Sequence, residues 1–264
     1  MIPIKSPREI EIMRVAGRIT GEAINAAARA IEPGVTTKQL DAIIRRHIES
    51  RGAAPSFLGY RGYQASACVS VNEAVIHGIP DDRKLAEGDI VSLDVGAYYN
   101  GFHGDSGATF GVGRISPEAQ QLIDVTKQCF YQALAFCQKG RRVHDISRAI
   151  QSYAALHGYA VVKKFTGHGV GAALHEDPEV PNYVSDRRGP RLISGMTIAV
   201  EPMIIMGGSS DVRVLNDEWT VVSADGSLTA YYEHTVLITD GGPELLTARD
   251  GDEPLPPVSA GGTP

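Results

Sequence analysis

The chain has 264 residues and a net charge of −6, with 43% hydrophobic and 21% charged residues, which is an ordinary composition for a globular protein with a large core. This charge, without a run of Lys or Arg, argues against a nucleic-acid or anionic-membrane surface. Three cysteines without a Cys-x-x-Cys pair argue against a disulfide framework and a thiolate zinc site, and no 18-residue apolar stretch predicts a membrane span.

Two helices are predicted at the start of the chain. Ser6-Pro7-Arg8-Glu9 combines a capping serine, a proline at the first helical position and a glutamate that completes a capping box. Apolar residues then recur with helical spacing until Pro33-Gly34, where we expect the helix to end. A second helix should be capped by Thr36 or Thr37 and should end at Gly52.

The same arrangement recurs in the second half of the chain. Ser116-Pro117-Glu118 predicts the start of a helix that ends at Gly140, and another helix is expected from about Val143 to Gly158. At an offset of 106 residues, the apolar faces of the second and fourth helices fall in register. This recurrence favours an internal duplication over a chance match, with halves at about 6–112 and 116–240.

Extended apolar segments follow each helix pair and predict strands. They lie at residues 67–71, 90–99, 109–112, 159–165, 195–205, 218–223 and 231–239. The pair Asn100-Gly101 is a strong hairpin signal and favours an antiparallel sheet. We therefore expect a single domain over residues 1–248. Residues 249–264 are rich in Pro, Gly and Asp and should be disordered.

Four carboxylates interrupt the strand-like segments, where acidic residues are rare. They are Asp94, Asp105, Glu201 and Glu233. Four converging acids would repel one another unless cations lay between them, because unpaired buried charges are costly. His168, which lies between two glycines, is a fifth candidate ligand. Four carboxylates and one imidazole suit two divalent first-row metal ions, so the sequence predicts a dinuclear metallohydrolase.

The positions of these residues along the chain support this interpretation. A hairpin at Asn100-Gly101 would place Asp94 and Asp105 on adjacent strands, where both carboxylates could reach one ion. His77 and His175 lie in loops rich in Gly and Pro. A lone histidine is more often structural, but these two neighbour the suspected metal-binding segments, which favours a functional role.

Together, these segments resemble those of the type I methionine aminopeptidases, which are pita-bread metallopeptidases. The matching stretches are Ser70–Pro80, Asp94–Asp105, Thr166–Gly171, Thr197–Pro202 and Tyr232–Thr235, and the resemblance spans essentially residues 1–245. It implies an α+β pita-bread fold. In this fold, two helix pairs related by a pseudo-two-fold axis cover the outer face of a central, curved antiparallel sheet.

By the same resemblance, two divalent metal ions are bound by Asp94, Asp105, His168, Glu201 and Glu233. Asp105 and Glu233 would bridge the ions, which would activate a water molecule and polarise the scissile carbonyl group. Cobalt, manganese, iron and zinc all accept carboxylate and imidazole ligands, so the sequence does not distinguish among them.

The resemblance also assigns catalytic and substrate-binding residues. Glu201 would carry a proton from the attacking water to the leaving amine, while His77 and His175 would bind the peptide and stabilise developing charge. The methionine side chain would be bound by Tyr60, Tyr63, Cys68, Trp219 and Phe57. Phe57 and Leu174 replace a cysteine and an aromatic residue that are common in the family, so the shape of the pocket should differ.

The implied activity is removal of the initiator methionine from nascent proteins and peptides when the second residue is small. Two alternatives remain: an Xaa-Pro aminopeptidase of the same fold, which usually carries a further amino-terminal domain, and a non-catalytic peptide-binding relative, which usually lacks metal ligands. The amino terminus has no signal-peptide pattern. We expect a cytoplasmic monomer without a membrane or nucleic-acid partner. It would act on nascent polypeptide N-termini, with association with the ribosome left open.

Overall fold

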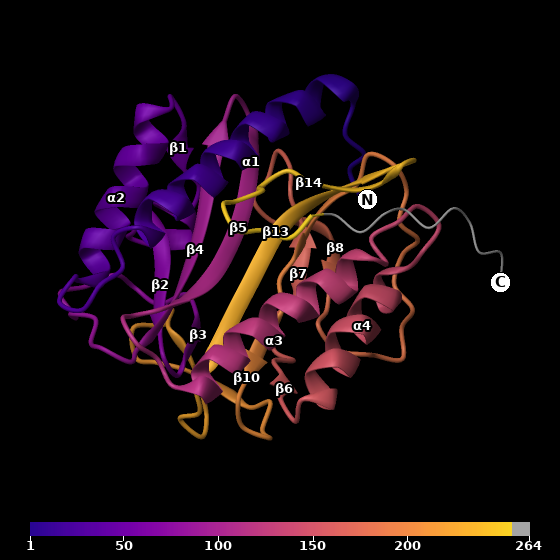
Figure 1. Ribbon diagram of the computed structural model, residues 1–264. Coiled ribbons are helices and arrows are strands. Elements are labelled where there is room, and N and C mark those ends of the chain that lie inside the picture. The colour runs from indigo at the N-terminus through magenta and orange to yellow at the C-terminus, as the bar shows by residue number, and fades with distance from the viewer. Residues whose placement is uncertain (255–264) are drawn as a thin grey trace.

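The computed structural model describes residues 1–254. Within this part of the chain, four α-helices lie on one side of a large antiparallel sheet (Figure 1). The helices are α1 (Pro7–Ala28), α2 (Thr37–Ser50), α3 (Pro117–Leu134) and α4 (Val143–Leu156), with a short 3-10 turn, η1 (Tyr60–Gly62). None of the described helices is long and apolar enough to cross a membrane.

The strands are short in the periphery and long in the centre of the sheet. They are β1 (Ala54–Pro55), β2 (Ala67–Val71), β3 (Ala74–Ile76), β4 (Ile90–Tyr99), β5 (Phe102–Gly111), β6 (Ala160–Val161), β7 (Gly167–Gly169), β8 (Glu176–Val180), β9 (Thr197–Val200), β10 (Met203–Ile205), β11 (Val212–Val214), β12 (Val221–Ser223), β13 (Thr229–Thr239) and β14 (Gly242–Leu245). The α+β class predicted from the sequence is therefore confirmed.

The predicted helix starts are confirmed, whereas the two long helices end earlier than predicted. The capping box of α1 forms, because Glu9 accepts a hydrogen bond from the Ser6 amide at 2.7 Å and donates its own amide to Ser6 Oγ. α1 ends at Ala28 and α3 at Leu134, before Gly34 and Gly140. Each of these glycines donates its amide to a carbonyl outside the helix, at 2.8 and 2.9 Å. Both glycines thus lie beyond the helix ends and form tertiary contacts there.

The sheet has eleven strands, and its main path runs β1-β4-β5-β13-β9-β7-β8, with antiparallel pairing throughout the described residues. β4 and β5 form the predicted hairpin, in which Asn100 and Gly101 both have positive φ, 45° and 96°. The segment predicted as one strand at 195–205 is split into β9 and β10 at Glu201-Pro202. Proline cannot donate to a sheet ladder, so the ladder is interrupted there. A second sheet has the order β11-β12-β3.

The two faces of the central sheet have opposite characters. Side chains alternate along a strand, so Leu93, Ala108 and Tyr232, which are in register across β4, β5 and β13, all point to the same face. This face packs against the helices in two hydrophobic clusters, one under α1 and α2 and one under α3 and α4. The next register row, Asp94 and Glu233 on either side of Gly107, points to the other face. The helices thus cover the apolar face and leave the acidic face free.

The described part of the segment expected to be disordered, residues 249–254, contacts the helix-covered face of the sheet. The Arg249 side chain is 3% exposed and donates hydrogen bonds to the Gly107 carbonyl at 2.6 Å and to His234 Nε2 at 2.8 Å. Asp252 accepts a hydrogen bond from the Tyr232 hydroxyl at 2.6 Å. The rest of this segment, 255–264, lies outside the described residues. The single-domain boundary and the internal duplication stay predictions.

The approach of α1 to the sheet gives a stability prediction. A Cβ built on Gly104 in β5 would lie 2.7 Å from the backbone of Gly17 in α1. Because backbone atoms cannot rotate away, Gly104→Ala should overpack this contact and lower the free energy of unfolding by about 1–3 kcal/mol. Chemical denaturation would measure the loss. Gly208→Ala is the matched control, because its Cβ would meet no atom within 4 Å, and an equal loss in both variants would contradict the prediction.

Candidate metal centre and peptide pocket

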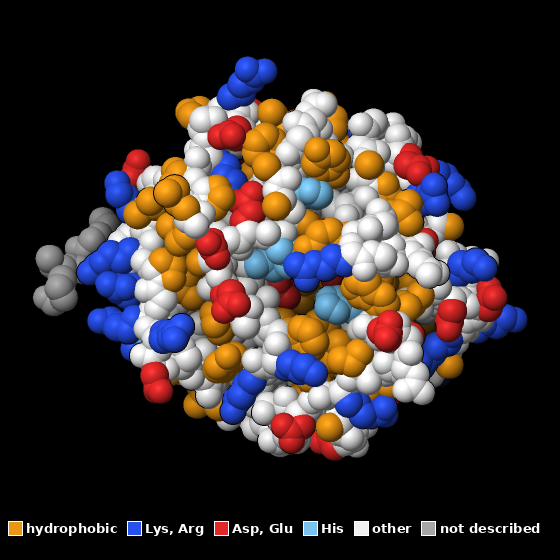
Figure 2. Space-filling view, turned by 180° about the vertical axis from the view of Figure 1, so that it is seen from behind, with side chains coloured by type: hydrophobic (Ala, Val, Ile, Leu, Met, Phe, Trp, Pro, Cys, Tyr) orange, Lys and Arg blue, Asp and Glu red, His pale blue; other side chains and the backbone are white. Residues whose placement is uncertain are grey.

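A pocket of about 320 Å³ opens on the face of the sheet that the helices leave free. Figure 2 shows this face as a hollow surrounded by histidine and hydrophobic side chains, with acidic side chains in its depth. The pocket is lined by all the residues that the sequence analysis assigned to the site: Phe57, Tyr60, Tyr63, Cys68, His77, Asp94, Asp105, His168, His175, Glu201, Trp219 and Glu233. Leu174 lines it as well. The sequence thus predicts which residues come together, while their individual roles stay proposals.

The strand register brings three of the carboxylates together. Asp94 and Glu233 lie on either side of Gly107, and Asp105 lies opposite Gly96 on the same hairpin. Gly107 has no side chain, and the ring of Tyr231 occupies the space beside it, because a Cβ on Gly107 would lie 2.3 Å from that ring. The Tyr231 hydroxyl donates to Glu233 Oε2 at 2.6 Å and holds this carboxylate in place. The β4–β5–β13 register therefore builds most of the acidic cluster.

Two further groups reach the cluster from neighbouring strands. Glu201 follows β9 directly, at the break before Pro202, and its carbonyl accepts a hydrogen bond from Asn182 at 2.9 Å. His168 is the central residue of β7. A Cβ on either flanking glycine would lie within 2.4 Å of a carbonyl oxygen of the adjacent strands, so the Gly-His-Gly sequence is needed for this close packing.

The orientation of the His168 ring favours metal binding. Its Nδ1 lies 2.8 Å from the Gly169 carbonyl, which can only accept, so Nδ1 carries the proton. Burial lowers the pKa of His168 to about 3, so the ring is neutral and Nε2 presents a lone pair. Nε2 lies 3.7 Å from Asp105 Oδ2 and 3.5 Å from Glu201 Oε1. A lone pair that faces carboxylate oxygens repels them unless a cation lies between.

The electrostatics of the cluster lead to the same conclusion. Burial, together with the charge of Glu233 and the other acids, raises the pKa values of Asp94, Asp105 and Glu201 well above the ordinary range, and burial raises the pKa of Glu233 to about 7. The Oδ1 atoms of Asp94 and Asp105 are buried and have no hydrogen-bond partner among the described residues. Ligand atoms of Asp105, His168 and Glu233 lie within 4.8 Å of one another. These oxygen and nitrogen donors fit divalent cations, which would remove the repulsion.

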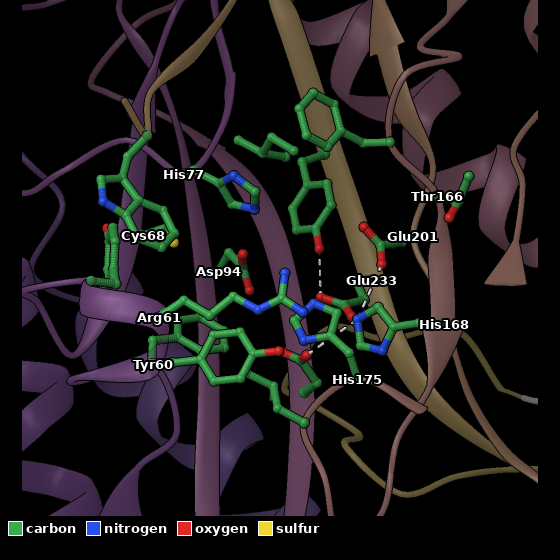
Figure 3. A pocket seen from close by; sticks show the side chains of 18 of the residues that line it. Tyr60, Arg61, Cys68, His77, Asp94, Thr166, His168, His175, Glu201 and Glu233 are labelled. Carbon is green, nitrogen blue, oxygen red and sulfur yellow. Dashed lines mark hydrogen bonds and ion pairs between the residues drawn. The ribbon is translucent and has the colours of Figure 1, made fainter. Parts of the chain in front are cut away.

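The two predicted substrate histidines occupy different sides of the pocket (Figure 3). His77 has a positive φ of 59° and meets the ring of Phe165 edge-on at 5.7 Å. Burial and the charge of His175 lower the pKa of His77 to about 4, so its ring is neutral at physiological pH. His175 stacks on Tyr60 at 5.2 Å and lies 4.0 Å from the ring of His168. Both rings are therefore fixed by aromatic neighbours.

The remaining wall of the pocket is apolar and aromatic. Its buried members are Phe57, Tyr63, Ala65, Cys68 and Leu174, and Tyr60, Ile79 and Trp219 pack against them. Cys68 lies opposite Asp94 in the β2–β4 pairing, so this wall directly adjoins the acidic cluster. A polarizable thioether fits a surface of aromatic rings and sulfur.

Sequence reasoning missed several residues near the site. Tyr231 could have been found, because it lies two positions before Glu233 in a strand and must share its face. Arg61 and Lys164, which also line the pocket, and Arg249 behind the sheet have no local signal that points to the site.

Comparisons with known proteins agree with this geometry. Residues 11–240 match the model of metallopeptidase family M24. The chain is 50% identical over 247 residues to a methionine aminopeptidase of Clostridium perfringens, covering 94% of this chain and 99% of that one. It is 48% identical over 247 residues to methionine aminopeptidase 1 of Bacillus subtilis, with the same coverage. The structure of methionine aminopeptidase from Thermotoga maritima superposes with a TM-score of 0.91 at 42% identity and covers 94% of this chain and 99% of that chain.

The fold and the buried cluster of acids and imidazole define a metallopeptidase of the pita-bread type, and the family implies that it uses divalent metal. Within family M24, the chain belongs to the methionine aminopeptidases, since relatives of 48–50% identity match it over nearly their whole length. The family predicted from the sequence is therefore confirmed.

Proposed function

We propose that this protein removes the initiator methionine from nascent proteins and peptides when the second residue is small. The observation that carries the proposal is the position of the acidic cluster beside an apolar, aromatic wall in one pocket. The wall suits the side chain of methionine, and the cluster suits hydrolysis of the peptide bond next to it. The relatives named above, which are methionine aminopeptidases, support the same reaction.

The metal ligands are proposed to be Asp94, Asp105, His168, Glu201 and Glu233, which would hold two divalent ions with Asp105 and Glu233 shared between them. When bound, such ions would polarise the scissile carbonyl group and make a water molecule nucleophilic near neutral pH. Cobalt, manganese, iron and zinc all remain compatible with these ligands.

Three side chains are proposed to handle the proton and the substrate. Glu201 is buried on the floor of the pocket, where its carboxylate can accept the proton of the attacking water and return it to the leaving amine. His77 and His175 line the pocket and can donate hydrogen bonds to the peptide and to the negative charge that develops on its carbonyl oxygen. Tyr60, Tyr63, Cys68, Trp219 and Phe57 are proposed to enclose the methionine side chain.

The proposal includes the partner and the location of the protein. As a monomer in the cytoplasm, it would act on the N-termini of nascent polypeptides, and association with the ribosome is left open.

Hydrolysis of Met-Ala-Ser and of Ala-Pro-Ala by the purified protein tests the function. We expect release of methionine from the first peptide and no cleavage of the second. The opposite pattern would indicate an Xaa-Pro peptidase, and no cleavage of either would indicate a non-catalytic relative.

The size limit on the second residue gives a separate prediction. The imidazoles of His77 and His175 are held by Phe165 and Tyr60 and cannot easily move aside. Isoleucine exceeds valine by one methylene, which corresponds to roughly 10- to 200-fold discrimination in a confined site. We therefore expect Met-Val-Ser to be cleaved with a kcat/KM that exceeds that of Met-Ile-Ser by a factor in this range. Equal kcat/KM values for the two peptides would show that the second subsite is wider than proposed.

A further inference from the structure

Two cationic side chains, Arg61 and Lys164, line the pocket in addition to the residues discussed above. Both are exposed, and within residues 1–254 neither forms an ion pair. The acidic residues that line the pocket are Asp94, Asp105, Glu201 and Glu233, which are the proposed metal ligands. The two cations at the mouth therefore have no acidic partner of their own among the described lining residues.

Arg61 lies in a tight backbone turn, and its side chain lines the pocket. Arg61 belongs to η1, where it has a positive φ of 49° between Gly59 and Gly62, whose φ values are 83° and 92°. Its guanidinium lies over the ring of Tyr60, 5.4 Å from the centroid. In Figure 3 the Arg61 side chain extends from the side of Tyr60 across the pocket. Its positive charge is close enough to contribute, after burial, to the lowered pKa of His175.

A short stack of rings connects Arg61 to the floor of the pocket. The guanidinium is 5.4 Å from Tyr60, the Tyr60 ring is 5.2 Å from His175, and the His175 ring is 4.0 Å from His168 at the floor. An extended peptide advances about 3.3–3.6 Å per residue. The three distances together place the guanidinium within about 15 Å of His168. For a substrate whose first peptide bond lies at the floor, the third and fourth side chains are therefore the first that can come within reach of the long Arg61 side chain.

Lys164 is the second cation of the pocket and lies in the segment near the other histidine, His77. It precedes Phe165, whose ring meets His77. Arg61 is therefore close to His175, and Lys164 lies in the segment that contacts His77. Two divalent ions would balance the four carboxylates of the floor, so the charge that a peptide meets at the mouth would come from Arg61 and Lys164.

We propose that Arg61, assisted by Lys164, selects substrates with an acidic side chain at the third or fourth position and disfavours substrates with a basic one. The inference rests on the proposed aminopeptidase function and adds a substrate class to it. Arg61 is the main determinant, because its side chain extends across the pocket and is held over Tyr60. The contact is exposed, so it is a preference that salt should weaken.

The test compares matched amidated peptides. Met-Ala-Glu-Ser is compared with Met-Ala-Lys-Ser, and Met-Ala-Ser-Glu with Met-Ala-Ser-Lys, using the metal-loaded protein at low ionic strength. We expect kcat/KM to be about tenfold higher for the acidic member of at least one pair, and this ratio to shrink toward one in about 0.5 M salt. Binding of the product amides Ala-Glu-Ser and Ala-Lys-Ser, followed by fluorescence of Trp219, the single tryptophan of the chain, should show the same order.

Variants assign the preference to Arg61. Arg61→Gln should bring the ratio close to one, Arg61→Lys should keep much of it, and Arg61→Glu should invert it. Lys163→Gln is the matched control, because it removes an exposed charge next to Lys164 that does not line the pocket; it should leave the ratio unchanged. Equal hydrolysis of acidic and basic peptides by the unmodified protein would overturn this inference but leave the proposed function intact. A ratio that survives Arg61→Gln would overturn it too. Failure to cleave any of these peptides would overturn the proposed function and the inference with it.

Discussion

Exhaustive removal of divalent metal is expected to abolish the hydrolysis of Met-Ala-Ser, and addition of Mn²⁺ or Co²⁺ to restore it. Without a cation, Asp94, Asp105, Glu201 and Glu233 repel one another, as their raised pKa values indicate. The attacking water would also lack activation, since bulk water has a pKa of about 15.7 compared with about 7 next to a suitable metal. Loss of metal should therefore remove the nucleophile and disturb the geometry of the site together.

The measurement combines turnover with metal content and stability. The protein is dialysed against a chelator until elemental analysis finds no divalent metal, then assayed before and after stepwise addition of Mn²⁺ or Co²⁺. An ion that binds only the folded state stabilises it, by about 2.7 kcal/mol at 100 times its dissociation constant. The melting temperature should thus rise together with activity. Mg²⁺, which prefers all-oxygen sites, is the control and should restore less activity. Full turnover by demonstrably metal-free protein would refute the metal-dependent mechanism.

The central sheet and the acidic cluster could be predicted because their signals are local. Asn100-Gly101 fixes a two-residue hairpin, and the hairpin then places Asp94 and Asp105 on neighbouring strands of one face. An acid in an apolar strand is costly in itself. The apolar sequence around Glu201 and Glu233 therefore suffices to predict a functional role for both.

Helix ends and tertiary supports could not be predicted, because their causes are distant in sequence. Gly34 and Gly140 stop no helix directly; their amides bind the carbonyls of Leu85 and Leu192. Arg249 lies in a segment whose composition suggests disorder, yet it donates to Gly107 from behind the sheet. No pattern within the segment reports that contact. The same holds for Arg61, whose position at the mouth depends on how η1 packs against His175.

The other large effect is expected for substitution of His77 and of His168, one of which should lower turnover and the other metal content. His77→Ala should lower kcat/KM for Met-Ala-Ser by roughly 10²–10³-fold, as does loss of a single donor to developing negative charge, while metal content is preserved. Burial keeps the pKa of His77 at about 4, so the ring acts as a neutral donor near pH 7. His168→Ala should instead lose metal, because the Nε2 atom that faces Asp105 and Glu201 disappears.

The backbone at His77 requires a second variant. Its φ of 59° is poorly tolerated by alanine and better by asparagine. His77→Asn therefore separates strain from loss of the imidazole, and its amide should retain part of the activity as a weaker donor. His157→Ala, at the end of α4 and outside the pocket, is the control for removal of a histidine. Turnover, bound metal and thermal stability are measured for all four variants. Equal loss of metal from the His77 and His168 variants would mean that His77 belongs to the metal site. Unchanged kcat/KM in His77→Ala would remove it from the reaction altogether.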